Sequence, residues 1–289
     1  METVIMSAKE PAYRYKKQIS DEATDKGRWI TLGVVMVGGE KASIAYADGL
    51  IRDFKECGMA VDWRYLDGNV DEERVANEIR SMNRRRSING VMVQLPLPKG
   101  MSKSAILNTI TPTKDVDCQT TINAGRLAQG CPFVTPCTPT GVLMLLDWYH
   151  IQPEGKHCVV IGRSDTVGKP LAAMLTARDA TVTLCHSATK ELAEHTRRAD
   201  MIVCAAGRRK LLTADMVKDG AVVVDVGINF DENGKMCGDV DFENVAPKCA
   251  AITPVPGGVG LMTRIALMSN TIMLAGGNVG LCGVNEVMN

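Results

Sequence analysis

Apolar runs and amphipathic segments alternate along most of the chain. Residues 29–37 are rich in β-branched side chains and end at Gly38-Gly39, which is typical of a strand buried on both faces. Residues 43–57 carry apolar side chains at helical spacing and are followed by Gly58, which predicts a helix. The same reasoning predicts strands at 59–65, 90–94, 157–161, 181–185, 201–204 and 221–226, and helices at 71–85, 102–109, 140–150, 169–177, 190–197 and 261–275.

This alternation indicates the fold class. Strands connected by helical crossovers form parallel sheets that are covered on both faces. A chain of 289 residues has room for about two domains. We therefore expect an α/β protein with two lobes, connected by the helical stretches near 140–150 and 261–275.

The composition excludes several classes of protein. Hydrophobic residues make up 45% and charged residues 23%, which argues against a disordered or low-complexity chain. Thirty-three Lys and Arg balance 33 Asp and Glu, so nothing in the net charge indicates nucleic acid or an anionic membrane as a partner. The one basic run, Arg84-Arg85-Arg86, is interpreted as a solvated helix end.

The cysteines, the histidines and the N-terminus indicate a cytoplasmic protein without a metal. None of the ten cysteines forms a Cys-x-x-Cys pair, and the four histidines lack zinc-type spacing. The first residues lack the order of a signal peptide, and the apolar stretch 265–275 is about half of the ~20 residues that span a membrane.

The clearest local motif is VVIGRSDTVGKP at 159–170. A strand leads into a turn bounded by Gly162 and Gly168 that opens a helix, as in dinucleotide-binding proteins, where helix N–H groups hold the pyrophosphate. Ser164 occupies the place of the second glycine, so an ordinary strand–helix turn stays possible. The next strand ends without an acidic residue for a ribose hydroxyl, whereas Arg163 and Ser187 could bind a 2′-phosphate. This favours NADP over NAD.

Two further groups of residues could contact a ligand. Tyr46, Gln94 and Asp117 lie at or near the ends of first-lobe elements, where α/β sheets bind ligands. Packing of the tyrosine and capping of a turn by the aspartate are the structural alternatives. A proline corner at 253–256 precedes Gly257 and Gly258, which would let the backbone approach a ligand or simply make a tight loop.

The strings GVMVQLPLP, TPTKDVD, PCTPTG, VVIGRSDTVGKP, VTLCHS, VVDVGIN, GDVDF and TPVPGGVG occur in this order between about residues 33 and 268. As a set they strongly resemble the methylenetetrahydrofolate dehydrogenase/methenyltetrahydrofolate cyclohydrolase (FolD-like) family. The resemblance implies a folate-binding lobe at 1–140, completed by a C-terminal helix at about 265–289. It also implies a Rossmann-type NADP domain at 141–264, a cleft between the lobes, a homodimer and no metal.

The resemblance also assigns roles to individual residues. Tyr46, Gln94 and Asp117 match catalytic and substrate-binding positions beside the pterin, and Gly257 and Gly258 match a loop against substrate and nicotinamide. The positions that match the cofactor side are Thr138, Pro139, Gly162, Arg163, Ser164, Gly168, His186, Ser187, Gly207, Ile228 and Thr263.

Three positions depart from the family pattern. Leu50 stands where the family has a lysine four residues after the tyrosine, Cys118 replaces the glycine of DVDG, and Leu261 replaces the proline of GGVGPMT. We expect oxidation of 5,10-methylenetetrahydrofolate to the methenyl form with NADP, in one-carbon metabolism, and doubt the cyclohydrolase activity because Leu50 cannot transfer a proton. A bifunctional enzyme with a substitute base, a non-catalytic folate-binding paralogue and a dehydrogenase for another substrate are the alternatives.

Overall fold

The computed structural model describes residues 2–25, 29–39 and 41–279. These residues divide into two compact units. The six-strand unit contains residues 2–13 and 138–263, and the three-strand unit contains residues 14–137 and 264–279 of the described ranges. Two helices, α1 (Lys9–Asp25) and α10 (Val259–Leu274), begin in the six-strand unit and continue into the three-strand unit.

The three-strand unit is built around a parallel sheet. Its strand order is β3 (Ala60–Leu66), β2 (Thr31–Val37), β4 (Gly90–Val93), and six of the seven residues of the central strand β2 are buried. The other elements of this unit are α2 (Lys41–Glu56), α3 (Glu72–Arg84), α4 (Lys103–Leu107), η1 (Pro112–Lys114) and α5 (Thr121–Ala128).

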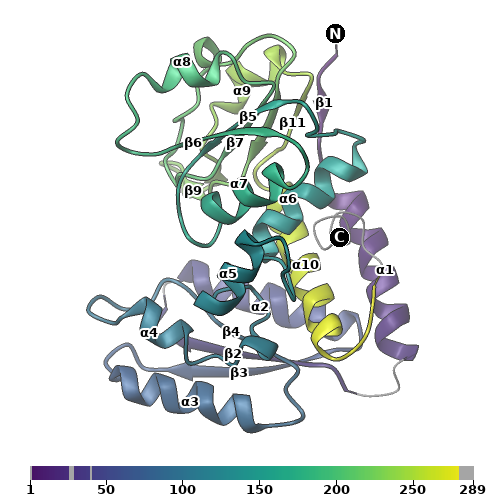
Figure 1. Ribbon diagram of the computed structural model, residues 1–289, viewed down its shortest axis with the longest axis vertical. Helices are drawn as coiled ribbons and strands as arrows, with labels where there is room; N and C mark the ends of the chain where they lie inside the picture. The colour runs from purple at the N-terminus through teal and green to yellow at the C-terminus, as the bar shows by residue number, and fades with distance from the viewer. Residues whose placement is uncertain (1, 26–28, 40, 280–289) are drawn as a thin grey trace. The chain divides into compact units, whose positions relative to one another are not determined.

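Helix α3 shows why this sequence forms a covered sheet. Asp71 caps its first turn by accepting a hydrogen bond from the Arg74 N–H. Its buried side chains, which include Val75, Ile79 and Met82, lie at helical spacing and pack against β2 and β4. Figure 1 shows α3 on one face of the sheet and α2 on the other.

The six-strand unit is also built around a wholly parallel sheet, with the strand order β1-β11-β8-β7-β5-β6. These strands are β1 (Val4–Ile5), β5 (His157–Ile161), β6 (Thr181–Cys185), β7 (Met201–Cys204), β8 (Val222–Asp225) and β11 (Ala251–Ile252). The remaining elements are α6 (Cys137–Trp148), α7 (Gly168–Thr176), α8 (Leu192–Thr196), η2 (Ala214–Met216), α9 (Phe242–Val245), η3 (Ala246–Lys248) and the antiparallel hairpin of β9 (Asn229–Phe230) and β10 (Met236–Cys237).

The prediction of a two-lobe α/β fold with parallel sheets is confirmed, with element ends shifted by a few residues. Helix α1 and strand β1 were not predicted. Because β1 pairs with β11, residues 2–13 group with the six-strand unit, whereas the expected first domain ran from 1 to 140. The units change at 137/138 and 263/264, close to the expected boundaries at 140 and 264. Helix α8 is shorter than predicted because Glu191 adopts a left-handed conformation (φ 48°).

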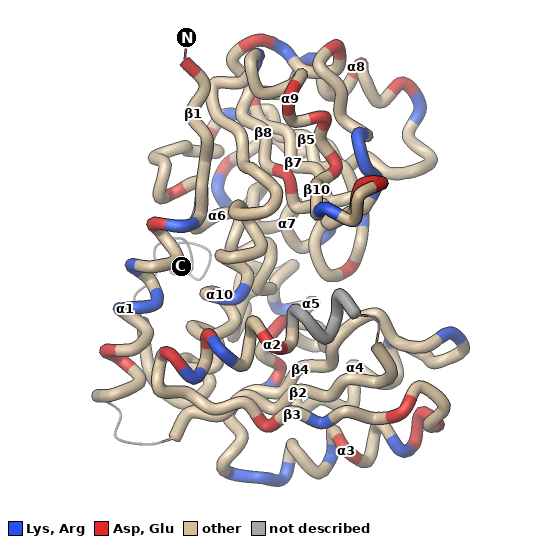
Figure 2. The backbone as a smooth tube through the Cα atoms, turned by 180° about the vertical axis from the view of Figure 1, so that it is seen from behind, with Lys and Arg blue, Asp and Glu red and all other residues tan. Residues whose placement is uncertain are grey.

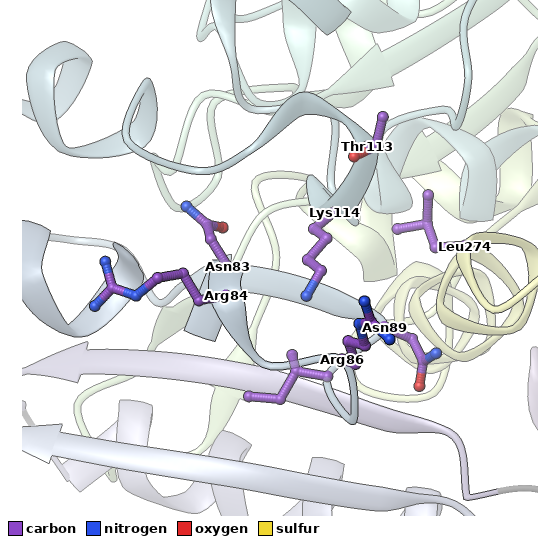
Figure 3. A pocket seen from close by; sticks show the side chains of 8 residues that line it. Asn83, Arg84, Arg86, Asn89, Thr113, Lys114 and Leu274 are labelled. Atoms are coloured by element: carbon purple, nitrogen blue, oxygen red, sulfur yellow. The ribbon is translucent and has the colours of Figure 1, made fainter. Parts of the chain in front are cut away.

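The basic run at the end of α3 has a structural explanation. Figure 2 shows it as the blue stretch that follows α3. Arg85 pairs with Asp62, while Arg84 and Arg86 line a pocket of about 420 Å³, which also contains Lys114 (Figure 3). The Lys114 ammonium donates to the Arg85 carbonyl at 2.8 Å, so it caps the helix end and complements its dipole. All three arginines are exposed, as expected for a solvated helix end, and Arg85 in addition pairs with Asp62.

Other expectations about the whole chain can be compared with the described residues. The nine cysteines among them are free thiols. Within the described ranges no helix is long and apolar enough to cross a membrane. The same ranges contain no cluster of three His, Cys, Asp or Glu side chains that could hold a metal.

A buried ion pair in the six-strand unit leads to a test of stability. The Arg178 guanidinium binds both carboxylate oxygens of Asp147 in α6, at 2.6 and 3.0 Å, and the two side chains are 6% and 13% exposed. Asp147→Ala removes the carboxylate that binds two nitrogens of this buried guanidinium, so we expect a loss on the order of 3 kcal/mol in the free energy of unfolding, measured with urea. Glu232→Ala removes the partner of Arg209 in an exposed pair and serves as the control. Equal effects of the two substitutions would contradict this view.

Candidate functional site

Gln94 lies at the carboxyl end of the three-strand sheet. Its N–H donates to the Val35 carbonyl at 2.8 Å, which fixes its backbone beside β2, and the next peptide, Leu95–Pro96, is cis. The side-chain Nε2 donates to the Leu95 carbonyl at 3.0 Å. The Oε1 atom is buried and has no hydrogen-bond partner within the described part of the chain. Such an acceptor is costly unless a ligand or another donor reaches it.

Asp117 lies close to the same edge of the sheet. The segment after η1 runs beside β4. The Val116 N–H donates to the Val91 carbonyl, and Asp115 forms an isolated parallel β-bridge with Val91. The Asp117 carboxylate accepts hydrogen bonds from the Cys137 N–H at 2.8 Å and from Gln119 Nε2 at 3.0 Å. Burial raises the pKa of Asp117 to about 6, and the neighbouring charge of Asp115 adds to this against the lowering effect of the hydrogen bonds.

Two residues that the sequence analysis did not select hold Asp117 in place. Asp115 is fully buried and accepts hydrogen bonds from the Gln119 and Thr120 N–H groups, the Thr120 hydroxyl and the Asn123 amide. Asn270 of α10 is also fully buried and donates to the Val116 carbonyl at 2.9 Å. An asparagine between the apolar stretches of α10 was the signal that could have indicated this role.

Helix α2 positions Leu50 in the core. Leu50 is fully buried, and Asp53, one turn further, pairs with Lys16 at 2.6 Å and with Arg264 at 2.5 Å. These two ion pairs connect α2 to α1 and α10 within the three-strand unit. Tyr46 lies in α2, but its side chain is outside the described part of the structure. Position 50 therefore offers an apolar side chain with no proton to give or accept.

Cys118 shows why a glycine suits the position after Asp117. Its backbone is left-handed (φ 53°), a conformation that glycine adopts without strain. The side chain is 5% exposed, and burial raises the pKa of its thiol far above the ordinary range. The thiol is thus a small apolar group beside the Asp117 loop.

In the six-strand unit, the turn between β5 and α7 depends on its two glycines. A Cβ at Gly162 (φ 126°) would lie 2.2 Å from the Ala205 carbonyl oxygen, and a Cβ at Gly168 would lie 1.8 Å from the Gly162 carbonyl oxygen. Ser164 accepts hydrogen bonds through its hydroxyl from the Val167 and Gly168 N–H groups at 3.2 and 3.4 Å. The serine in place of the second glycine therefore supports the N-terminus of α7.

The strand register brings Arg163 and Ser187 close together just beyond the carboxyl ends of β5 and β6. Ile161 of β5 pairs with Cys185 of β6, and each of the two residues lies two positions further along its chain. Both are exposed, and Arg163 forms no ion pair within the described part of the chain. His186 is oriented by the Ala188 N–H, which donates to its Nδ1 at 3.2 Å.

The other residues expected on the cofactor side are also in the six-strand unit. Thr138 and Thr263 lie 3.3 Å apart at their hydroxyls, which joins α6 to α10. Gly207 (φ 63°) and the 63% exposed Ile228 follow β7 and β8, respectively. Gly257 (φ 101°) faces open space, whereas a Cβ at Gly258 would lie 2.5 Å from the Pro254 carbonyl oxygen. Leu261, which replaces a family proline, donates its N–H to the Gly258 carbonyl.

Two buried carboxylates behind these loops were missed as functional candidates. Asp225 ends β8 and Asp239 follows β10, and they are 3% and 0% exposed. Their strings, VVDVGIN and GDVDF, contributed to the resemblance, but neither aspartate was given a role. An aspartate next to an apolar run and near a glycine was the available signal.

Comparisons with known proteins agree with this arrangement. The tetrahydrofolate dehydrogenase/cyclohydrolase catalytic domain matches residues 6–117, and the NAD(P)-binding domain of the same family matches residues 136–278. The chain belongs to this family.

Relatives and solved structures match over most of the chain. It is 48% identical over 250 residues to the bifunctional protein FolD of Variovorax paradoxus, covering 86% of this chain and 88% of that protein. The crystal structure of FolD from Campylobacter jejuni superposes with a TM-score of 0.91 at 43% identity, covering 95% of this chain and 99% of that one. The Trypanosoma brucei enzyme, solved with NADP cofactor and inhibitor, gives a TM-score of 0.91 at 35% identity, with 95% and 97% covered.

The raised pKa of Asp117 leads to a pH-dependent effect on stability. Since its pKa is about 6 in the folded state and ~3.9 in an unfolded chain, the stabilising contribution is complete below about pH 4 and is lost as the pH rises through about 6. Asp117→Asn removes this titration, so the variant should gain stability relative to the parent over that range in urea unfolding.

Asp21→Asn, on the exposed face of α1, is the control substitution. The raised pKa would be contradicted if the parent and Asp117→Asn differed in their free energy of unfolding by the same amount at every pH from about 4 to about 7.

Proposed function

We propose that this protein is an NADP-dependent methylenetetrahydrofolate dehydrogenase of one-carbon metabolism. It oxidises 5,10-methylenetetrahydrofolate to 5,10-methenyltetrahydrofolate. A hydride leaves the bridge carbon of the folate, and NADP⁺ supplies the nicotinamide ring that accepts it. The observation that carries this proposal is that both family domains match in order while Gln94, Asp117 and the glycine-bounded turn are all present.

The folate side is assigned to the three-strand unit. Asp117 is held at the carboxyl edge of the sheet by backbone and side-chain donors, so its carboxylate is oriented to accept hydrogen bonds from the pterin edge. Gln94 offers a buried acceptor without a partner among the described residues. Tyr46 completes the set by resemblance, beside the pterin. The substrate loop of Gly257 and Gly258 is assigned by resemblance as well.

The residues of the six-strand unit fit an NADP molecule. The steric limits at Gly162 and Gly168 leave no room for a side chain in the turn before α7, and the resemblance assigns the pyrophosphate of NADP to this turn. Arg163 and Ser187 are exposed beyond the carboxyl ends of β5 and β6, where the Arg163 guanidinium is available to bind a 2′-phosphate. Ser164, His186, Thr138, Gly207, Ile228 and Thr263 are assigned to the remaining contacts by resemblance.

No side chain has to take a proton in this oxidation. The rate is therefore expected to come mainly from positioning of substrate and cofactor. The folate-binding and NADP-binding domains are assigned to 1–140 with 265–289 and to 141–264, as the resemblance implies. A homodimer in the cytoplasm completes the proposal.

The direct test is NADPH formation by the purified protein with 5,10-methylenetetrahydrofolate and NADP⁺. Turnover supports the dehydrogenase. Tight folate binding without turnover would favour the non-catalytic paralogue, and turnover only with another substrate would favour a different dehydrogenase.

The second family activity, hydrolysis of the methenyl cation to 10-formyltetrahydrofolate, is expected to be weak or absent. That reaction moves protons between water, carbon-bound oxygen and folate nitrogen, and general acid–base groups contribute ~10²–10⁴-fold to such steps. Leu50, fully buried and apolar, occupies the position of the family lysine. The free acceptor on Gln94 is consistent with a missing ammonium donor.

Leu50→Lys should restore hydrolysis of the methenyl cation to well above the parent rate. The added ammonium supplies a proton-transfer group and, since the resemblance implies that position 50 lies beside Gln94, a donor for the Gln94 Oε1 atom. The measurement is the decay of methenyltetrahydrofolate absorbance with and without protein, at a pH where spontaneous hydrolysis is slow.

Leu50→Met, of similar volume and without a proton, is the matched control. A robust enzymatic hydrolysis by the unmutated protein would mean that another group has replaced the lysine.

Arg163→Ala should remove most of the preference for NADP over NAD. One charge-assisted Arg–phosphate contact corresponds to roughly ten- to a hundredfold in affinity. Lys169→Ala is the control. Lys169 lies in the first turn of the same helix, α7, and its ammonium already pairs with Asp165 at 2.7 Å. Steady-state kinetics with both cofactors gives the preference, and equal kinetics with NAD and NADP in the unmutated protein would refute the assignment.

A further inference from the structure

Two buried carboxylates connect the loops that follow β7 and β8. Asp225 is the last residue of β8, and Asp239 lies in the segment after β10. The two side chains are 3% and 0% exposed, and no cation is paired with either carboxylate within the described residues. Burying two acids without a cation is unfavourable unless hydrogen-bond donors satisfy them.

Asp225 joins three segments. Its Oδ1 accepts from the Gly227 N–H at 2.9 Å and the Asp239 N–H at 3.0 Å, and its Oδ2 accepts from the Val240 N–H at 2.9 Å. Its own N–H donates to the Thr253 hydroxyl at 2.7 Å, four residues before Gly257. Burial raises the pKa of Asp225 to about 6 against the effect of these backbone donors.

Asp239 extends the same network to the loop after β7. Its Oδ2 accepts from the Ala206 and Gly207 N–H groups at 2.7 and 3.0 Å. Its Oδ1 accepts from the Arg208 N–H at 2.8 Å and from the Asn229 Nδ2 at 2.9 Å. Both carboxylate oxygens are therefore surrounded by donors.

Two glycines make room for these carboxylates. A Cβ at Gly227 would lie 2.2 Å from Asp239 Oδ1, and a Cβ at Gly238 would lie 1.9 Å from Asp225 Oδ2. Neither glycine has a positive φ, so close approach rather than backbone conformation requires them. The backbone is thus packed directly against both acids, and the loop conformations depend on them.

The connected loops contain residues assigned to the cofactor. Residues 206–208 include Gly207, and Ile228 lies between Gly227 and Asn229, both of which donate to the acids. Ile228 is nevertheless 63% exposed, so its flanking residues are held inward while its side chain points outward.

We infer that Asp225 and Asp239 are positioning residues that hold the 206–208 and 226–229 loops in the conformation that binds NADP. The inference rests on the proposed function, because that function assigns these loops to the cofactor. Neither acid is expected to touch the folate or the reacting atoms.

Asp239→Asn provides the sharpest test. An amide in either orientation turns its NH₂ group toward N–H donors, so one side of the network is lost while the size of the side chain stays the same. We expect the Kd and KM for NADP to rise roughly tenfold or more, with KM for the folate and kcat at saturating NADP nearly unchanged. Amide hydrogen exchange at 206–208 should become faster.

A second substitution tests the same network from its partner side. The Asn229 Nδ2 group donates to Asp239 Oδ1 at 2.9 Å and to the Gly238 carbonyl at 3.0 Å. Asn229→Asp places two carboxylates face to face and should weaken NADP binding.

Asp200→Asn is the matched control in the same sheet. Asp200 precedes β7 at the amino ends of the strands, and accepts from the His157 N–H at 2.8 Å and from Lys218 at 2.5 Å. It should change thermal stability without changing the Kd for NADP. If Asp239→Asn behaves like this control, or raises both KM values equally, the positioning role is overturned. NADP binding without NADP reduction in the unmutated protein would overturn only the proposed function, and absence of NADP binding would overturn both.

Discussion

The loops of this protein depend on buried aspartates that accept hydrogen bonds from backbone N–H groups beyond the ends of parallel strands. Where a strand ends, its neighbours no longer supply acceptors, and a buried N–H without an acceptor is costly. Asp115 satisfies this need in the three-strand unit, and Asp225 and Asp239 satisfy it in the six-strand unit. The residues assigned to ligands are attached to these same loops, so the positions of the functional groups follow from backbone hydrogen bonding.

This constraint distinguishes residues that position the loops from residues that are proposed to contact a ligand. Asp117 differs from Asp115, two residues earlier, because it keeps capacity to accept further donors while Asp115 is surrounded by protein donors. The family match covers both domains, yet Leu50 changes the chemistry available at one point without disturbing the fold. A fully buried leucine is compatible with the core around α2, which Asp53 anchors through two cations. Under the proposed function the dehydrogenase and hydrolase activities can be separated, because only the hydrolysis is expected to need a proton-transfer group at that position.

The basic run at 84–86 illustrates the limit of reading charge from sequence. Three successive arginines have the same formal charge, but Arg85 pairs with Asp62 and its carbonyl receives the Lys114 ammonium. The flanking arginines remain on the pocket wall (Figure 3). The helix end, rather than a ligand, accounts for the lysine.

The sequence by itself determined the alternation of strands and helices, the two parallel sheets and the membership of the family, because burial on both faces and the glycine-bounded turn leave local patterns. It also indicated Arg163 and Ser187 as candidates for a 2′-phosphate, and the strand register then brought them together, two positions beyond the paired residues Ile161 and Cys185. It did not reveal β1 or α1, because β1 has only two residues and is a strand only through its pairing with β11, 247 residues later for Val4 and Ala251. Nor did it reveal Asp225, Asp239 and Asn270 as organisers of the site. Their partners come from other segments of the chain: Asp225 and Asp239 accept from N–H groups of separate loops, and Asn270 donates to the Val116 and Thr135 carbonyls. Only the tertiary structure decides which backbone groups a buried carboxylate or amide will meet.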